Sequence, residues 1–109
     1  MKQVLLFGAG KSATVLIDYL LMNAPGQNWS LTVVDADLQV AQNKVGTSPF
    51  ARAVSFDITD GNERKKYISQ ADIVISLMPP TLHYLIAVDC LEYRKNLLTA
   101  SYVDEQIRL

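Results

Sequence analysis

Short apolar runs alternate along the chain with longer segments in which apolar residues recur every three or four positions. A continuous apolar run of this length is typical of a strand buried on both faces, and the three-to-four spacing is typical of a helix packed on one side. The runs cover residues 4–7, 31–34, 53–56, 73–77 and 97–100, and the longer segments cover 11–23, 37–45, 61–70 and 81–94. This pattern predicts four strand–helix units followed by a fifth strand.

Strands that are separated by helices pair in parallel, and right-handed crossovers place the helices on both faces of the sheet. The sequence therefore predicts an α/β fold, a doubly wound, Rossmann-like parallel sheet in three αβα layers with five strands in the order 3-2-1-4-5. Turns are predicted at 24–30 and 46–49, where Gly and Pro gather. The pair Pro79 and Pro80 is predicted to delay the last helix until Thr81.

Composition excludes several classes of partner. With 109 residues, half of them hydrophobic, the chain is long enough for one domain with a buried core. Its formal net charge is −1 and the two signs are mixed, so the sequence predicts binding neither to nucleic acid nor to a membrane surface. The first apolar run is too short for a signal peptide or a membrane span. A single cysteine, Cys90, and a single histidine, His83, predict no internal disulfide and no metal site, and we expect a cytoplasmic protein.

The segment "FGAGKS" at residues 7–12 raises two interpretations of a nucleotide-binding loop. A P-loop requires a glycine five positions before Gly10, where this chain has Leu5, so that interpretation fails. The dinucleotide pattern G-x-G-x-x-G/A fits Gly8, Gly10 and Ala13, between a predicted strand and a predicted helix. The sequence predicts a dinucleotide-binding loop.

Each position of this loop has an expected task. Gly8 would allow the tight turn, Gly10 would let a pyrophosphate approach the backbone, and Ala13 would pack the helix against the strand. The neighbouring amides of Ala9, Lys11 and Ser12 are expected to face the phosphates at the positive end of the helix. We expect the Lys11 side chain itself to be solvated, because the backbone already supplies the donors.

An acidic residue follows the second predicted strand at the spacing where dinucleotide-binding proteins bind the adenosine ribose. This residue is Asp35, whereas Asp37 directly precedes a helical segment and is expected to cap it. A carboxylate at Asp35 would repel the 2′-phosphate of NADP, and Ala36 offers no guanidinium to neutralise it. The sequence therefore predicts NAD rather than NADP, although Lys44 and Arg52 lie near enough in sequence to offset the repulsion.

The remaining strand ends carry weaker candidates. Asp57 is expected either at the adenosine end of the cofactor or in a plain turn, with Ile58 against the adenine and Asp60 as the cap of the next helix. Ser76 ends the fourth strand, and His83 lies on the first turn of the helix after it, where a structural or solvated role is favoured over proton transfer.

Hydroxyl groups follow the fifth predicted strand. Thr99, Ser101 and Tyr102 lie where a nicotinamide or a substrate would bind, and a role in the turn is equally open for them. No residue is assigned as the general acid or base.

Several of these segments together resemble one family. "GAGKSATVLIDYL", "VVDAD", "FDITD" and "VISLMPPTLHYLIAVDCLEYRKNLLTASYV" resemble the amino-terminal cofactor domain of saccharopine dehydrogenases, which form or oxidise saccharopine, an aminoadipate–glutamate conjugate of lysine metabolism. The most specific part is the last, with Ser-Leu-x-Pro, then Thr and His, a helix, and Thr-Ala-Ser-Tyr.

The resemblance implies a role for most of the candidates. Pyrophosphate would lie at Gly8 and Gly10, the ribose at Asp35, and the adenine end at Asp57 and Ile58. The nicotinamide ribose would be lined by the loop Ser76, Leu77, Met78 and Pro79, and Ser101 with Tyr102 would lie toward the nicotinamide and an amino-acid substrate. Pro80 departs from the aromatic residue that the family pattern leads us to expect, which puts substrate contact by this loop in doubt.

The resemblance also implies an activity. We expect the NAD(P)-binding part of an oxidoreductase that acts on a secondary amine or imine. Helix 11–23 is apolar on more than one side, and residues 101–109 look like the start of a further helix, so we expect a longer enzyme, inactive without its substrate domain and homo-oligomeric. Two alternatives stay open on the residues alone, a nucleotide-sensing regulatory domain of a channel or transporter and a methyltransferase.

Overall fold

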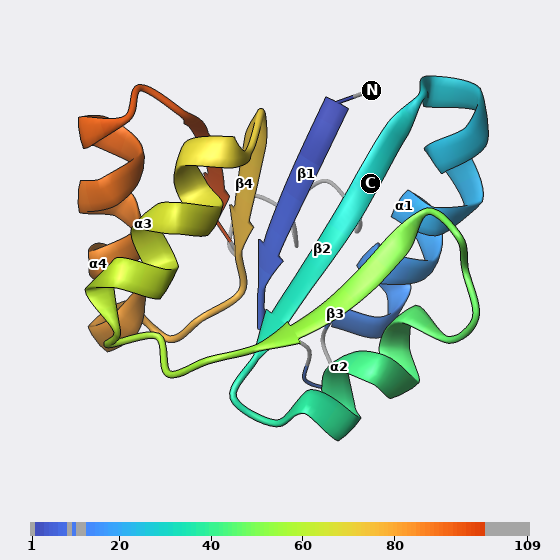
Figure 1. Ribbon diagram of the computed structural model, residues 1–109, viewed down its shortest axis with the longest axis horizontal. Helices are drawn as coiled ribbons and strands as arrows, with labels where there is room; N and C mark the ends of the chain where they lie inside the picture. The colour runs from blue at the N-terminus through green and yellow to red at the C-terminus, as the bar shows by residue number, and fades with distance from the viewer. Residues whose placement is uncertain (1, 9, 11–12, 100–109) are drawn as a thin grey trace.

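The computed structural model describes residues 2–8, 10 and 13–99 of the chain, and the placement of every element below refers to this part. Five strands and four helices alternate along it (Figure 1). They are β1 (Lys2–Phe7), α1 (Thr14–Gln27), β2 (Trp29–Asp35), α2 (Leu38–Val45), β3 (Ala51–Ser55), α3 (Gly61–Gln70), β4 (Ile73–Ser76), α4 (Pro80–Glu92) and β5 (Asn96–Thr99).

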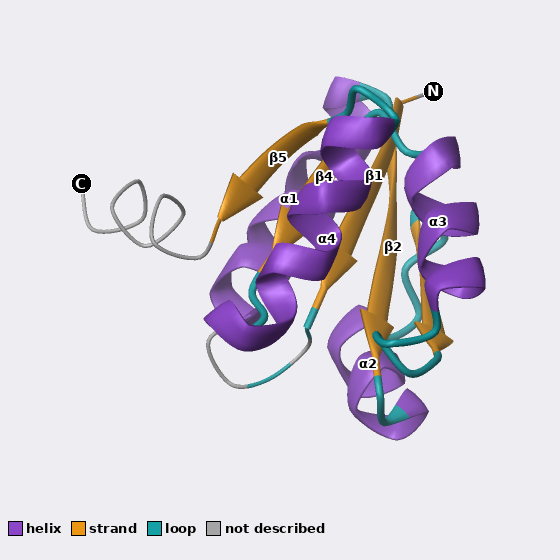
Figure 2. Cartoon of the chain, turned by 90° about the vertical axis from the view of Figure 1, so that its left-hand side faces the viewer, coloured by secondary structure: helices purple, strands orange, loops and turns teal. Residues whose placement is uncertain are grey.

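The five strands form one parallel sheet in the order β3-β2-β1-β4-β5, which confirms the predicted doubly wound, Rossmann-like α/β fold. In the register of the central strand, Val4 of β1 lies opposite Leu31 of β2 and Ile73 of β4. β1 thus has a partner on each side, and β5 lies at the outer edge beyond β4 (Figure 2). The order reverses between β1 and β4, where parallel sheets of this kind bind ligands.

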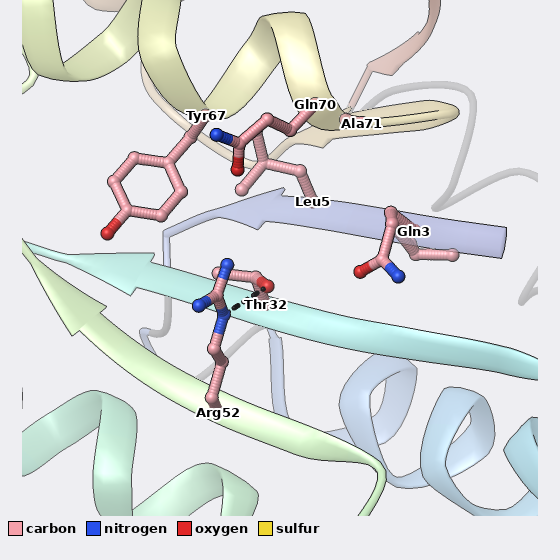
Figure 3. A pocket seen from close by; sticks show the side chains of 8 residues that line it. Gln3, Leu5, Thr32, Arg52, Tyr67, Gln70 and Ala71 are labelled. Carbon is pink, nitrogen blue, oxygen red and sulfur yellow. Dashed lines mark hydrogen bonds between the residues drawn. The ribbon is translucent and has the colours of Figure 1, made fainter. Parts of the chain in front are cut away.

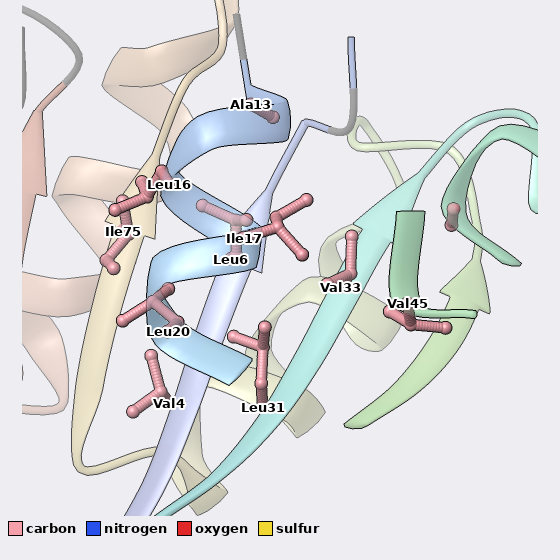
Figure 4. Close-up of a cluster of buried hydrophobic side chains, with 11 residues drawn as sticks. Val4, Leu6, Ala13, Leu16, Ile17, Leu20, Leu31, Val33, Val45 and Ile75 are labelled. Carbon is pink, nitrogen blue, oxygen red and sulfur yellow. The ribbon is translucent and has the colours of Figure 1, made fainter. Parts of the chain in front are cut away.

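Alternate residues of the strands supply two separate hydrophobic cores. Val4 and Leu6 of β1 face α1 and α2 (Figure 4), whereas Leu5 and Phe7 face α3 and α4. The helices therefore cover both faces of the sheet and make the three predicted layers (Figure 1). Ile17 of α1 is fully buried, and burying a side chain of this size stabilises a fold by about 1.5–3 kcal/mol.

Two aspartates cap the helices that start at the carboxyl edge of the sheet, as the sequence predicts. Asp37 Oδ1 accepts hydrogen bonds from the backbone N–H of Gln39 (2.9 Å) and of Val40 (3.4 Å) at the start of α2. Asp60 Oδ1 accepts from the N–H groups of Asn62 (3.1 Å) and Glu63 (3.3 Å) at the start of α3. Both caps satisfy amide groups that have no partner within the helix.

The turn predicted at 24–30 is wrong except at Asn28, because α1 continues through Pro25 to Gln27 and β2 begins at Trp29. Proline removes one hydrogen bond from a helix, but here Ala24 is fully buried and holds the last turn on the core. Asn28 ends the helix in the left-handed conformation (φ 58°) and donates its N–H to the Ala24 carbonyl. Trp29 fixes the same turn by donating its indole Nε1–H to the Leu20 carbonyl (2.9 Å).

The delayed start of the last helix is also wrong, since Pro80 is itself the first residue of α4. Proline fits the first helical position because its φ is already helical and the N–H that it lacks would have no partner there. The carbonyl of Pro79 accepts hydrogen bonds from the N–H groups of Leu82 and His83, so the helix starts directly after the loop.

Helix α1 packs on one side only within the described part of the chain. Val15, Tyr19 and Met22 are 62%, 59% and 80% exposed. The sequence predicts packing partners on several sides of this helix, but the described elements cover only one side. The helix expected at 101–109 lies outside the described residues. Among the described helices, none is long and apolar enough to cross a membrane.

Candidate cofactor site

The carboxyl ends of β1, β2 and β3, the loop after β4 and the start of α4 line a cavity of about 450 Å³ at one edge of the sheet. This volume lies in the range of small-molecule sites in proteins. The lining residues are Phe7, Val34, Asp35, Ala36, Ser55, Phe56, Asp57, Ile58, Met78 and Leu82. Most of them are apolar, and the two carboxylates lie on the β2 and β3 side.

Gly8 makes the turn out of β1 that this edge requires. Its φ of +99° is one that other residues rarely adopt, and its N–H donates to the Val34 carbonyl (2.8 Å). A Cβ atom at this position would lie 3.5 Å from the backbone of Leu77 and from the sulfur of Met78. The glycine is therefore required by the backbone conformation, and the loops after β1 and β4 lie in contact.

Gly10 and Ala13 differ from Gly8 in what surrounds them. A Cβ atom at Gly10 would meet no atom within 4 Å, so the space beside this backbone is open. Ala13 is fully buried in the core between α1 and the sheet, and its N–H donates to the Gly10 carbonyl (3.0 Å). The predicted cofactor roles of Ala9, Lys11 and Ser12 concern residues outside the described part of the chain.

Asp35 lies at the polar side of the cavity, at the end of β2. Its Oδ2 atom accepts a hydrogen bond from the backbone N–H of Asp37 (2.9 Å), which turns the carboxylate partly toward its own loop. Ser55, on the neighbouring strand, donates its hydroxyl to the Ala36 carbonyl (2.9 Å) and ties the β2 and β3 ends together.

Asp57 and Ile58 form the wall contributed by the β3–α3 loop. Asp57 Oδ1 accepts hydrogen bonds from the N–H (2.9 Å) and the hydroxyl (2.7 Å) of Thr59, and these bonds lower the pKa of the Asp57 carboxyl below its ordinary value. The side chain is thus a carboxylate acceptor at neutral pH. Ile58 is only 9% exposed and packs in the core while it lines the cavity.

The loop after β4 supplies the opposite wall. Ser76 is fully buried, and its hydroxyl accepts a hydrogen bond from the N–H of Met78 (3.4 Å). Leu77 donates its N–H to the Phe7 carbonyl (2.9 Å), so Met78 is held over the cavity and Pro79 leads into α4.

The structure thus brings four of the predicted site residues into one cavity, Asp35, Asp57, Ile58 and Met78. Gly8 lies beside Met78, whereas Ser76 is buried and does not line the cavity. Sequence reasoning missed Phe56 and Leu82, which are ordinary apolar residues in the sequence and become lining residues only through the fold. Ser101 and Tyr102 lie outside the described residues.

A second cavity lies away from this edge, between α3 and the strands β1, β2 and β3 (Figure 3). Its volume is about 60 Å³, room for roughly two water molecules and not for a nucleotide. The side chain of Arg52 extends into this cavity and donates through Nε to the Thr32 hydroxyl (3.1 Å). Its Cζ atom lies 5.6 Å from the ring centre of Tyr67. The cavity at the carboxyl edge is therefore the better candidate for a cofactor.

Comparison with known proteins gives the site its context. Residues 4–109 match the family described as the saccharopine dehydrogenase NADP binding domain. The chain belongs to this family. It is 33% identical to alpha-aminoadipic semialdehyde synthase of Arabidopsis thaliana, over 94% of this chain and 11% of that protein. It is also 33% identical to saccharopine dehydrogenase [NADP(+), L-glutamate-forming] of Saccharomyces cerevisiae, over 98% of this chain and 23% of that protein.

Solved structures agree with this membership. The apo saccharopine dehydrogenase (L-Glu forming) from Saccharomyces cerevisiae superposes with a TM-score of 0.82 at 33% identity, covering 94% of this chain and 22% of that chain. A short-chain dehydrogenase/reductase from Veillonella parvula in complex with NADP has a TM-score of 0.71 at 12% identity, which shows the fold alone. The predicted saccharopine dehydrogenase resemblance is confirmed, and none of these relatives supports a regulatory channel domain or a methyltransferase.

The prediction of NAD over NADP is wrong. The saccharopine dehydrogenase family is described by its NADP binding domain, and the yeast relative is named for NADP(+). The prediction assumed that the full charge of the Asp35 carboxylate opposes a 2′-phosphate, yet its Oδ2 atom accepts a hydrogen bond from the backbone N–H of Asp37, which offsets part of that charge. In addition, Lys44 Nζ donates to the hydroxyl of Thr14, so a cation lies at the start of α1, while Arg52 lies in the second cavity.

The chain spans 11% and 23% of the length of the two relatives described above. The saccharopine dehydrogenase family is one of oxidoreductases, and the matched region is its nucleotide-binding domain. The activity of a whole enzyme is therefore a matter of proposal for this chain.

Proposed function

We propose that this domain binds NADP(H) at the carboxyl edge of its sheet, with the adenosine half in the cavity between β2, β3 and α4. The observation that carries the proposal is the cavity itself. It offers apolar side chains for a heterocycle at Ile58 and Leu82, and carboxylate acceptors for ribose hydroxyls at Asp35 and Asp57.

The pyrophosphate would lie between this cavity and the start of α1. Open space beside Gly10 supports this placement, since a phosphate can approach the backbone there. The first turn of α1 carries no acidic residue, so the positive end of the helix dipole is not opposed where α1 begins. The cation of Lys44 at Thr14 adds to the attraction for a phosphate.

The nicotinamide half would extend toward the loop from Ser76 to Pro79. When bound, the cofactor supplies hydride transfer at its nicotinamide ring, and we propose that the carbon partner is that of a secondary amine or imine in an amino-acid substrate. The described residues of this chain bind and orient the cofactor. Residues that hold the substrate and move its proton are not assigned within it.

We further propose that this chain is the dinucleotide-binding part of a longer enzyme, has no turnover alone, and works in the cytoplasm as a homo-oligomer. The small share of each relative that it spans supports the first two points. The exposed apolar residues Val15, Tyr19 and Met22 of α1 support contact with another chain or domain.

Titration of the full-length protein with NADPH and NADH tests this function. We expect NADPH to bind more tightly than NADH, and Ser55→Trp, which fills the cavity from an exposed position, to weaken NADPH binding at least tenfold. Ser69→Trp, at an exposed position of α3, is the matched control and should leave the affinity unchanged. Equal NADPH affinity in both variants would place the cofactor elsewhere.

A further inference from the structure

A buried arginine joins α3, α4 and the wall of the cofactor cavity. Arg64 on α3 is 7% exposed and Asp89 on α4 is 2% exposed, and the guanidinium Nε donates to the Asp89 carboxylate. The Nη1 atom of the same guanidinium donates to the backbone carbonyl of Ile58 (2.7 Å). One side chain thus holds a partner helix and a loop carbonyl at the same time.

The loop that receives this bond is part of the cavity. Ile58 lines the cavity from the β3–α3 loop, and Leu82 lines it from α4. Asp89 lies seven residues, about two helical turns, after Leu82 on that same helix. The contacts of Arg64 therefore link the two elements that carry these lining residues.

We propose that Arg64 is a positioning residue for the adenosine half of the cofactor, acting through the carbonyl of Ile58 and anchored by Asp89. The inference rests on the proposed function and adds to it a residue that never touches the cofactor. Its role is to fix where Ile58 stands in the cavity wall.

The chemistry of the side chain suits this task. A guanidinium presents donors in a rigid planar fork, so it satisfies a carboxylate on one helix and a carbonyl on a loop from a single position. A buried carbonyl without a donor is costly, and a buried charge without a partner is more so. Without the guanidinium, the Ile58 carbonyl would have no donor at this place, and the β3–α3 loop would shift so that the carbonyl reaches another donor.

Linking α3 to α4 does not by itself require a buried pair. Lys65 and Glu92, the neighbouring pair on the same two helices, lie 3.5 Å apart with side chains 42% and 54% exposed. Neither residue lines the cavity. Buried ion pairs are often no more stabilising than apolar residues of similar size, so the bond to Ile58 is what distinguishes Arg64.

The two halves of the cofactor provide a test with separate readouts. Full-length wild type, Arg64→Lys and the control Lys65→Met are titrated with adenosine 2′,5′-bisphosphate, which carries only the adenosine half, and with nicotinamide mononucleotide. Lysine keeps the charge beside Asp89 and removes the fork. We expect Arg64→Lys to weaken binding of the bisphosphate roughly tenfold and to leave the mononucleotide unchanged, and Lys65→Met to bind both like wild type.

A second variant covers the case in which Arg64→Lys does not fold. The double substitution Arg64→Met with Asp89→Leu replaces the ion pair by apolar side chains and should fold, yet it lacks the donor to Ile58 and should show the same selective loss. Bisphosphate affinity equal to wild type in a folded variant, or an equal loss for both half-cofactors, overturns the positioning role. A wild type that binds neither NADPH nor the bisphosphate overturns the proposed function as well.

Discussion

Alanine at Gly8 should destabilise the fold, whereas alanine at Gly10 should weaken cofactor binding. Gly8 has a φ of +99°, in the region where a side chain is strained whatever the surrounding space. Gly10 has no such φ and has open space beside it. The same substitution two residues apart in one loop therefore separates a conformational role from a role in leaving room for a ligand.

The magnitudes follow from these two environments. At Gly8 the added Cβ would meet its nearest atoms at 3.5 Å, an ordinary contact, so the cost comes from the backbone and amounts to about 1–3 kcal/mol. At Gly10 the added Cβ meets nothing, and replacing a glycine whose φ suits alanine stabilises a protein by about 0.4–1 kcal/mol. With cofactor present, that Cβ would occupy the approach of the pyrophosphate.

Urea unfolding without cofactor and NADPH titration, both on the same samples, measure the two effects. We expect Gly8→Ala to lower the free energy of unfolding by about 2 kcal/mol. Gly10→Ala should keep or raise that free energy and raise the dissociation constant for NADPH at least tenfold. The reasoning is refuted if Gly10→Ala destabilises as much as Gly8→Ala, or if Gly10→Ala binds NADPH like wild type.

Three further outcomes are expected. Lys44→Met should weaken the binding of NADPH and of NADH to a similar degree, because its ammonium lies at Thr14, where α1 begins and the pyrophosphate common to both cofactors would lie. A loss confined to NADPH would place this ammonium at the 2′-phosphate instead. Burial, and then the adjacent carboxylate of Asp89, raise the pKa of the Cys90 thiol to about 11. The free energy of unfolding should therefore hold its full contribution from Cys90 below the thiol's ordinary pKa and fall as the pH rises toward 11. The same pH dependence of the free energy of unfolding in Cys90→Ala would contradict this. Asp60→Ala should cost about 1 kcal/mol in urea unfolding through the lost cap, with Asp60→Asn close to wild type, and a cost shared equally by both variants would show that charge rather than capping matters.

The order of the sheet followed from the alternation of runs because the inner strands β1, β2 and β4 are largely buried and a helix separates each strand from the next. The segment 61–70 matches α3 in both bounds, helped by the capping aspartate before it. The predictions at the two prolines were wrong because proline was treated as a residue that stops a helix, without regard to its position in the helix. Pro25 lies in the last turn of helix α1, which the buried Ala24 holds on the core, and Pro80 lies at the first position of α4, where proline is favoured.

The site was predictable where it depends on strand ends and unpredictable where it depends on distant partners. Asp57 and Ile58 follow β3 directly, and the parallel sheet brings them to the cavity. Arg64 and Asp89 are 25 residues apart, and nothing in their spacing pairs them. The signal that was available is a pair of opposite charges on the apolar sides of two successive helices. The cofactor choice failed because the hydrogen bond from Asp37 to Asp35 depends on how the loop closes.

A crystal structure of the full-length protein with NADP⁺ tests the central claim most directly. The account predicts the adenine in the cavity at the carboxyl edge, against Ile58 and facing Leu82, with its ribose beside Asp35 and the pyrophosphate at Gly10. Adenine bound at any other place, with this cavity filled only by water, would contradict it.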